Sequence, residues 1–177
     1  MEYNFKNPSG KKQLEIQAHE SIKIFLEDFS NNSTSFHLKV NLLGNYCKCE
    51  IIGRAQSSGS IKKTWKISQK FLGKSQKGSI NLHGIAEDNS FLEFDGKGFL
   101  EKISENADIN ITEKILLFDK AKGKSLPILT VKTDKVKKAK HAASITPLSE
   151  ELIFYCESRG IALKKSKKIL TRGFLKI

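Results

Sequence analysis

Cysteine is scarce in this chain of 177 residues, which has only Cys47, Cys49 and Cys156. The number is odd and the spacing fits no disulfide framework, which predicts a reducing compartment. Long apolar runs are also missing, since no stretch approaches the roughly 18 apolar residues of a membrane span. The N-terminus, MEYNFKNPSGKK, has no apolar segment of the kind found in signal peptides. These absences predict a cytoplasmic protein that does not enter a membrane.

Signatures of catalysis are missing as well. Residues 123–125 (GKS) lack the preceding glycine spacing of a phosphate-binding loop. The four histidines, His19, His37, His83 and His141, lie in dissimilar contexts, and no nucleophile–base–acid constellation can be assembled around them. We therefore expect a protein that is not an enzyme, and any ATP chemistry would come from a partner.

Arginine is rare in a basic chain. The net charge is +12, yet Arg54, Arg159 and Arg172 are the only arginines. The excess lysine either binds phosphate backbones or decorates every surface of a lysine-rich protein. Base-reading sites favour arginine, and the lysine strip over residues 132–140 lacks aromatic side chains on which bases stack. That strip is more typical of an edge strand protected by lysines. A basic nucleic-acid-binding β-protein stays open as an alternative.

A hydrophobic period of two runs from residue 14 to residue 136, in short segments such as FHLKVNL at 36–42. Segments at this spacing are typical of a sandwich, a barrel or a solenoid. Turns are rarely of the Asn-Gly hairpin kind, and some strands have successive apolar positions, as in Ile51-Ile52. We predict a mainly β fold with a β-helix core over 14–145 and a flexible N-terminal arm over 1–13.

The C-terminal residues 146–177 have a helical pattern instead. Ser149 is placed to cap a first helix, with Glu150 and Glu151 in its positively polarised first turn. Arg159 and Gly160 are typical of the end of that helix. A second helix is predicted over residues 163–174.

Several of these segments resemble one known family. They are His141 followed by small residues, Ser149-Glu150-Glu151-Leu152, Phe154-Tyr155-Cys156, Arg159-Gly160-Ile161 and Gly173-Phe174, with Lys77-Gly78, Phe94-Asp95-Gly96, Leu116-Leu117 and Pro127 upstream in similar order. The pattern resembles the C-terminal end of the SufB/SufD proteins, the scaffold subunits of SUF iron–sulfur cluster assembly. It covers roughly residues 60–177, which corresponds to the family's core domain without its N-terminal helical region.

The resemblance implies a right-handed parallel β-helix followed by helices. In the family two such cores pair, so it implies a homodimer or a SufB/SufD-like heterodimer. It also implies that the C-terminal helices dock on SufC, the ABC-type ATPase subunit. The implied partner-binding residues are Ser149, Glu150, Glu151, Phe154, Tyr155, Arg159, Gly160 and Phe174. A transient iron–sulfur cluster is implied near the paired cores, with no intrinsic cofactor.

The departures from the family point to SufD rather than SufB. SufB-type members have a cysteine shortly before the Leu-Leu pair, where this chain has Glu113, and a glutamate after the histidine, where it has Ala142. Soft thiolates are what iron–sulfur clusters prefer. The resemblance makes His141 a candidate metal ligand. Glu113 is a second candidate if it faces His141 across a strand or an interface.

Cys47 and Cys49 form a C-x-C motif. In a strand the two thiols face the same side, where they could bind a soft metal or relay sulfur. The sequence has no second C-x-C and no nearby histidine to complete four ligands, and buried free cysteine is the commoner case. A metal-handling protein that uses Cys47 and Cys49 is nevertheless a second alternative function.

Overall fold

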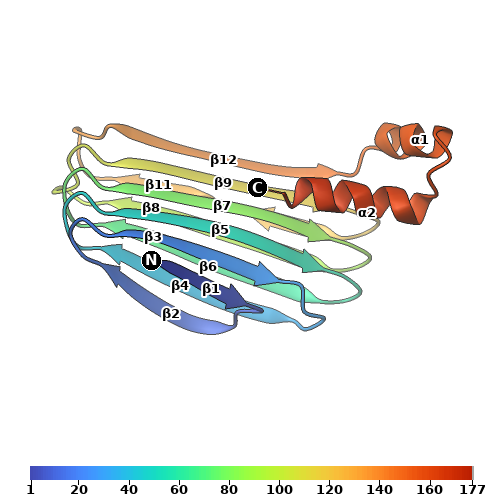
Figure 1. The fold of residues 1–177 in the computed structure, drawn as a ribbon, viewed down its shortest axis with the longest axis horizontal. Helices are drawn as coiled ribbons and strands as arrows, with labels where there is room; N and C mark the ends of the chain where they lie inside the picture. The colour runs from blue at the N-terminus through green and yellow to red at the C-terminus, as the bar shows by residue number, and fades with distance from the viewer. Residues whose placement is uncertain (177) are drawn as a thin grey trace.

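A computed structural model describes residues 1–176, and its core is two stacked sheets followed by two helices (Figure 1). The strands are β1 (Glu2–Lys6), β2 (Gly10–Ile16), β3 (Ser21–Asp28), β4 (Thr34–Leu42), β5 (Lys48–Ser57), β6 (Lys62–Phe71), β7 (Lys77–Ala86), β8 (Phe91–Leu100), β9 (Asp108–Leu117), β10 (Lys122–Ser125), β11 (Ile128–Val131) and β12 (Lys138–Pro147). The helices are α1 (Glu150–Ser158) and α2 (Leu163–Phe174).

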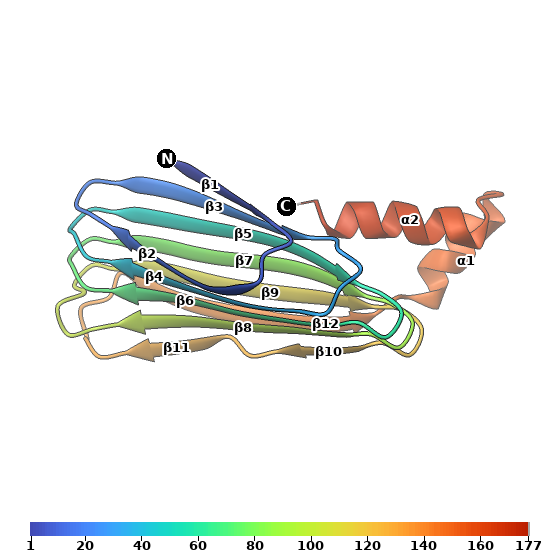
Figure 2. The same ribbon diagram turned by 90° about the horizontal axis from the view of Figure 1, so that it is seen from below.

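The chain alternates between the two sheets. One sheet, here called sheet A, has the order β1-β3-β5-β7-β9-β12, and the other, sheet B, has the order β10-β8-β6-β4-β2, with β11 also paired to β8. All pairings are parallel, and central strands pair with a strand about 30 residues later, a solenoid period. Figure 2 shows the two sheets with their strands running in opposite directions. The predicted parallel β-solenoid is confirmed.

Register explains how the core is filled. Residues paired on neighbouring parallel strands point to the same side, so sheet A stacks Ile24, Ile51, Ile80 and Ile111 in one ladder. All four are fully buried between the sheets. The period of two in the sequence therefore reflects the alternation of inward-facing and outward-facing side chains along each strand. Each coil adds one inward-facing side chain to each ladder.

The turns at one end of the coils stack in the same way. His19, Tyr46, Ser75 and Asn106 all have positive φ. Each donates its backbone N–H to a carbonyl of the next coil, at 3.1, 3.0, 2.8 and 2.7 Å respectively. These bonds satisfy backbone groups that a tight turn would otherwise leave unpaired.

The predicted flexible arm over 1–13 is wrong. β1 pairs with β3 and β2 pairs with β4, so both belong to the solenoid. Tyr3 and Phe5 pack against the core, with ring centroids 6.5 Å apart, and Pro8 is buried. These apolar side chains cover core surface at the first coil, which outweighs the polar composition of the segment.

The lysine strip is also mostly not a strand. β12 begins only at Lys138. Before it, Lys132 pairs with Glu101 at 2.9 Å and Lys135 with Glu105 at 3.3 Å. The loop lysines therefore lie against acids of the preceding coil.

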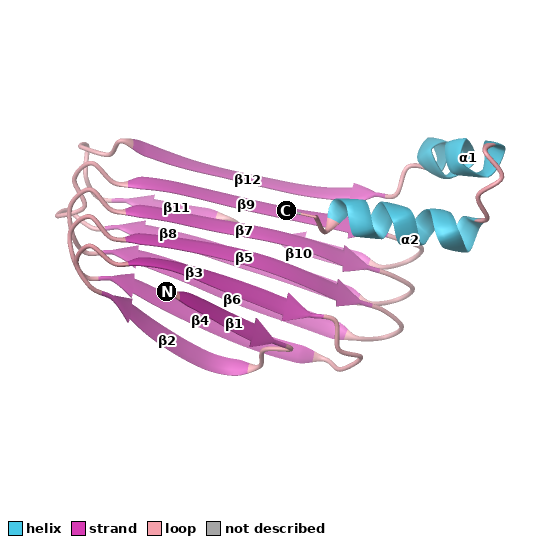
Figure 3. Ribbon diagram, in the orientation of Figure 1, coloured by secondary structure: helices cyan, strands magenta, loops and turns pink. Residues whose placement is uncertain are grey.

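The helical tail forms as the sequence predicts (Figure 3). Ser149 Oγ accepts a hydrogen bond from Leu152 N at 3.4 Å, and Gly160, just after the helix, has a φ of 75°. α2 returns toward the solenoid, where Leu175 packs with Ile85, Leu116 and Phe118. Within residues 1–176, neither helix has the length and apolar character needed to cross a membrane.

Candidate functional site

Glu113 and His141 lie on adjacent strands of sheet A, with their side chains on the same side. His141 pairs with Ile111, so it takes the next place in the isoleucine ladder. Glu113 pairs with Leu82 on one side and with Ala143 on the other. The two candidates are therefore diagonal neighbours, two residues apart along the strand direction. The structure brings together two residues that the sequence separates by a whole coil.

The Glu113 carboxyl group is fully buried, at 0% exposure. It accepts hydrogen bonds from Gly96 N at 2.6 Å and from the Ser125 hydroxyl group. Desolvation raises the pKa of Glu113, partly offset by bonds from Ser125, Gly96 and Leu126, and the nearby Asp95 raises it further. Both carboxyl oxygens are thus occupied by protein donors that join β8, β9 and β10.

Gly96 is required for this arrangement. A Cβ atom at that position would lie 2.5 Å from Glu113 Oε1, which is closer than real contacts allow. The absence of a side chain lets the backbone N–H reach the carboxyl group. The sequence did not reveal Gly96 or Ser125 as partners of Glu113, because the contacts come from strands that only the register brings together.

His141 is exposed at the open end of the solenoid. Its Nδ1 lies 2.9 Å from the carbonyl oxygen of Pro127. A carbonyl only accepts, so Nδ1 carries a proton, and in the neutral ring Nε2 is then the acceptor. This is the arrangement in which metal-binding histidines are held, with one ring nitrogen donating to a carbonyl. His141 can act through Nε2 as a ligand or as a base.

One short segment touches both candidates. Residues 125–127 connect β10 to β11, with Ser125 bonded to Glu113 and Pro127 bonded to His141. In the part of the chain that the structure describes, no three His, Cys, Asp or Glu side chains gather closely enough to hold a metal ion. Glu113 and His141 therefore form a two-residue cluster, and the short connection between β10 and β11 contacts both of them.

Cys47 and Cys49 lie in the interior of the solenoid. Cys47 Sγ donates to Gly44 O at 3.1 Å and lies 3.5 Å from Gln76 Nε2. Burial raises the pKa of the Cys47 thiol and raises that of Cys49 to about 12. Because the thiolate is the form that binds metals, this environment favours inert core packing over ligation. It weighs against the metal-handling alternative.

The helical tail presents the predicted partner-binding residues unevenly. Phe154 is 73% exposed and Tyr155 58% exposed, and every residue of α1 is exposed or half-buried. Arg159 lies over the Tyr155 ring at 5.4 Å. Ser149, Glu150, Glu151 and Gly160 cap or begin the helices. Phe174 is different, because it packs on His83 of the solenoid, with ring centroids 5.4 Å apart.

Comparison with known proteins agrees with this geometry. Residues 8–174 match the family described as SUF system FeS cluster assembly, SufBD core domain. The iron-sulfur cluster assembly protein SufD of Bacillus subtilis is 30% identical over 129 residues, which covers 72% of this chain and 28% of that protein. An iron-sulfur cluster assembly SufBD family protein of Galdieria sulphuraria is 26% identical over 139 residues, covering 76% of this chain and 61% of the relative.

The chain thus spans less than two thirds of the length of these relatives. The match nevertheless runs through the solenoid and into α2. From its sequence and its fold, the chain belongs to the SufBD family of iron–sulfur cluster assembly proteins.

Proposed function

We propose that this chain is a non-catalytic, cytoplasmic scaffold of iron–sulfur cluster assembly that docks a SufC-type ATPase through its helical tail. The observation that carries the proposal is the set of exposed apolar side chains on α1. Leu152, Phe154 and Tyr155 are each at least half exposed, on a helix that contributes nothing buried to the solenoid. Large exposed aromatic side chains are typical of protein interfaces. The family match is what makes an ATPase the expected partner.

Calorimetric titration of the full chain with a SufC-type ATPase tests docking. Aromatic anchors account for much of the binding free energy at interfaces. The double substitution Phe154→Ala and Tyr155→Ala should therefore weaken binding by at least about tenfold, which corresponds to ~1.4 kcal/mol. Tyr46→Ala is the control, since Tyr46 is 64% exposed in the turn between β4 and β5, away from the helices. Absence of any binding by the unmodified chain would overturn the docking proposal.

Pairing with a second core is the other part of the proposed function. β12 is the last strand of sheet A and pairs on one side only, with β9. Nearly all of its residues are exposed, including Ala142 and Ser144. Such a strand presents unpaired backbone groups to which another strand can add. A homodimer or a SufB/SufD-like heterodimer would cover this edge.

Sedimentation velocity tests pairing. Charged side chains on an edge strand oppose strand addition. Ala142→Lys combined with Ser144→Lys should therefore shift the protein toward monomer. Thr112→Lys is a control for a lysine added one strand away from the edge, because Thr112 is the residue of β9 that pairs with Ala142. Equal sedimentation of both variants and the parent, with no paired species alone or with a SufB-like partner, would contradict the proposal.

His141 is the residue we expect to approach a nascent cluster at the paired edge. Its free Nε2 and its place on β12 support that role. Glu113 is a supporting residue in this proposal, because its oxygens are already bonded to Gly96 and Ser125. His141→Ala should reduce cluster formation in the assembled complex while leaving ATPase docking unchanged, as followed by absorbance of the cluster. Unchanged cluster formation would remove His141 from the proposal.

A further inference from the structure

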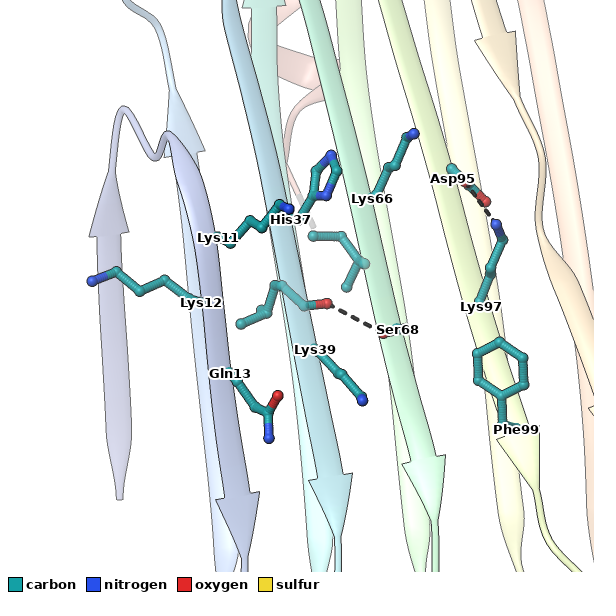
Figure 4. A pocket seen from close by; sticks show the side chains of 12 residues that line it. Lys11, Lys12, Gln13, His37, Lys39, Lys66, Ser68, Asp95, Lys97 and Phe99 are labelled. Carbon is teal, nitrogen blue, oxygen red and sulfur yellow. Dashed lines mark hydrogen bonds and ion pairs between the residues drawn. The ribbon is translucent and has the colours of Figure 1, made fainter.

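Sheet B has a hollow on its outer surface, away from the core, with a volume of about 540 Å³. Four successive strands contribute lysines to it: Lys11 and Lys12 from β2, Lys39 from β4, Lys66 from β6 and Lys97 from β8. Figure 4 shows these side chains rising from neighbouring strands. We name this surface the lysine groove. It lies on sheet B, whereas α1 follows β12 of sheet A.

Strand register arranges four of the five lysines in two rows, whereas Lys12 pairs with the buried Leu38 and so lies on the other side of β2. Lys11 and Lys66 both pair with His37, one from each side, and Lys39 and Lys97 both pair with Ser68. Within a row the lysines are two strands apart, or about 9.6 Å, and the rows are two residues apart, or about 6.6 Å. The cations therefore alternate from side to side across four strands.

Counter-charges are scarce in the lysine groove. Asp95 is the carboxylate that lines it, and its Oδ2 lies 3.0 Å from Lys97 Nζ. In residues 1–176, no carboxylate oxygen lies within 4.0 Å of the ammonium groups of Lys11, Lys39 and Lys66. The four lysines of the two rows, against the one carboxylate of Asp95, leave a net charge of +3 on this face.

Other lysines on the solenoid surface form ion pairs with acidic side chains. Lys124 pairs with Glu93 at 2.9 Å, and Lys70 pairs with Glu101 at 3.4 Å. Both pairs join neighbouring coils, so lysine decoration alone does not produce an unpaired cluster. A concave surface with one sign of charge concentrates ligands of the opposite sign.

We propose that the lysine groove binds an extended acidic segment of a partner protein, laid across the strands of sheet B. In an extended chain, successive side chains point to opposite sides. Carboxylates on alternate sides would therefore reach the two rows of lysines. The charge of the groove and the separation of about 6.6 Å between its two rows of lysines fit this occupant.

Single-stranded nucleic acid fits the groove less well. Such ligands are held by stacking of successive bases on aromatic side chains, often with arginine. The rings that line the groove are Phe99 and His37, and its cations are all lysine. An acidic peptide needs neither stacking nor arginine, so the lining favours a peptide.

Fluorescence anisotropy with the full chain tests the proposal. The probe is a short labelled peptide of consecutive glutamates, which places carboxylates on both sides of an extended chain, and a labelled oligothymidine is run in parallel. The variant Lys11→Gln/Lys39→Gln/Lys66→Gln removes three groove charges. The control Lys6→Gln/Lys77→Gln/Lys114→Gln removes three exposed lysines that do not line the groove. Matched melting curves for both variants would show that the fold is intact.

We expect the groove variant to bind the acidic peptide about tenfold more weakly and the control to stay within about twofold of the parent. Binding should also weaken as salt rises, since the contacts are screened charges. Equal losses in both variants would overturn the proposal and leave only a general effect of net charge. Tighter binding of the oligothymidine than of the peptide would also overturn it, in favour of a nucleic-acid site. Absence of peptide binding by the parent chain at low salt would refute it directly.

Discussion

Lys63 and Asp28 form a buried ion pair inside the solenoid, with Nζ 2.6 Å from Oδ1 and both side chains at 0% exposure. Lys63 also donates to the carbonyl oxygens of Asp28 and Ser30, while Asp28 accepts from the hydroxyl groups of Ser30 and Thr34. Every charged atom therefore has partners, which is the condition for a buried pair to persist. The network closes the turn between β3 and β4.

Removing one partner should be costly. Asp28→Ala leaves an uncompensated buried ammonium group, so we expect the free energy of unfolding to fall by about 3–5 kcal/mol. The control is Glu50→Ala, which breaks two partly exposed pairs, with Lys23 at 3.8 Å and with Lys48 at 3.9 Å, and should cost less than about 1 kcal/mol. Urea denaturation measures both. Similar losses for the two variants would show that the buried pair has no special role.

The same pair predicts a pH dependence. Desolvation opposes ionisation of Asp28, but hydrogen bonds from Lys63, Ser30 and Thr34 outweigh it and lower its pKa below 3.8. A lowered pKa in the folded protein means that the unfolded chain binds protons more readily in acid, so the free energy of unfolding decreases as pH decreases. The contribution of Asp28 is present above pH 3.8 and is lost as pH falls through its folded pKa. In Asp28→Ala, acid titration of stability should lose this component.

The three cysteines should differ in reactivity. Cys47 and Cys49 are buried with raised pKa values, whereas Cys156 lies half-buried on α1. Because thiolates are the reactive species, a thiol reagent at neutral pH should modify Cys156 quickly. It should modify Cys47 and Cys49 only as the protein unfolds. Mass spectrometry of digested protein should locate the fast modification at Cys156. Rapid labelling of Cys49 in the native protein would contradict its placement in the core.

At the scale of elements, α2 is held to the solenoid by His83. The ring of His83 packs on Phe174, and its Nδ1 lies 2.8 Å from the Phe174 carbonyl oxygen. Desolvation lowers the pKa of His83. The hydrogen bond to Phe174 opposes this effect, and the positive charges of Lys114 and Arg54 add to it. Lys167 adds a second tie, since its Nζ lies 3.0 Å from Asp119 Oδ1.

Docking of α2 should therefore weaken in mild acid. His83 has a lowered pKa while α2 is docked, so it binds a proton more readily once α2 has left the solenoid. The docked state therefore loses stability as pH falls below about 6.5. Hydrogen exchange of the α2 amides should speed up between neutral pH and pH 5, after correction for the intrinsic rate. His83→Phe keeps a ring against Phe174 and should remove this pH dependence. Persistence of the dependence in that variant would assign it to another group.

The strands and helices differ in how far the sequence predicted them. The period of two and the Ser149 and Gly160 caps are local signals, and they predicted the solenoid and both helices correctly. β1 was missed because Tyr3 and Phe5 gain their burial from a core that only the complete coils create. The environment of Glu113 was not predictable for a similar reason, since Gly96 and Ser125 reach it only through strand register. Local patterns thus determine the elements, while contacts between coils determine the site.

At the scale of the whole molecule, each coil contacts mainly its neighbours, so stability should vary along the stack. The central strands β5, β6, β7 and β8 are paired on both sides, whereas β12 is paired on one side and is nearly all exposed. In solenoids, stability is approximately a sum of coil and nearest-neighbour terms. Amide exchange should be slowest in the central coils and fast in β12 of the unpaired chain, because its outer backbone groups face solvent.

Pairing through the edge would change that gradient in a specific way. If a second core adds to β12, the amides of residues 138–147 should become protected as protein concentration rises or as a SufB-like partner is added. Amides of β1 and β2, at the other end of the stack, should be unaffected and serve as the internal control. Protection of β1 and β2 in place of β12 would show that assembly uses the opposite end of the solenoid. Protection of α1 alone on adding the ATPase would separate docking from pairing, because α1 follows β12 in the chain but lies outside both sheets.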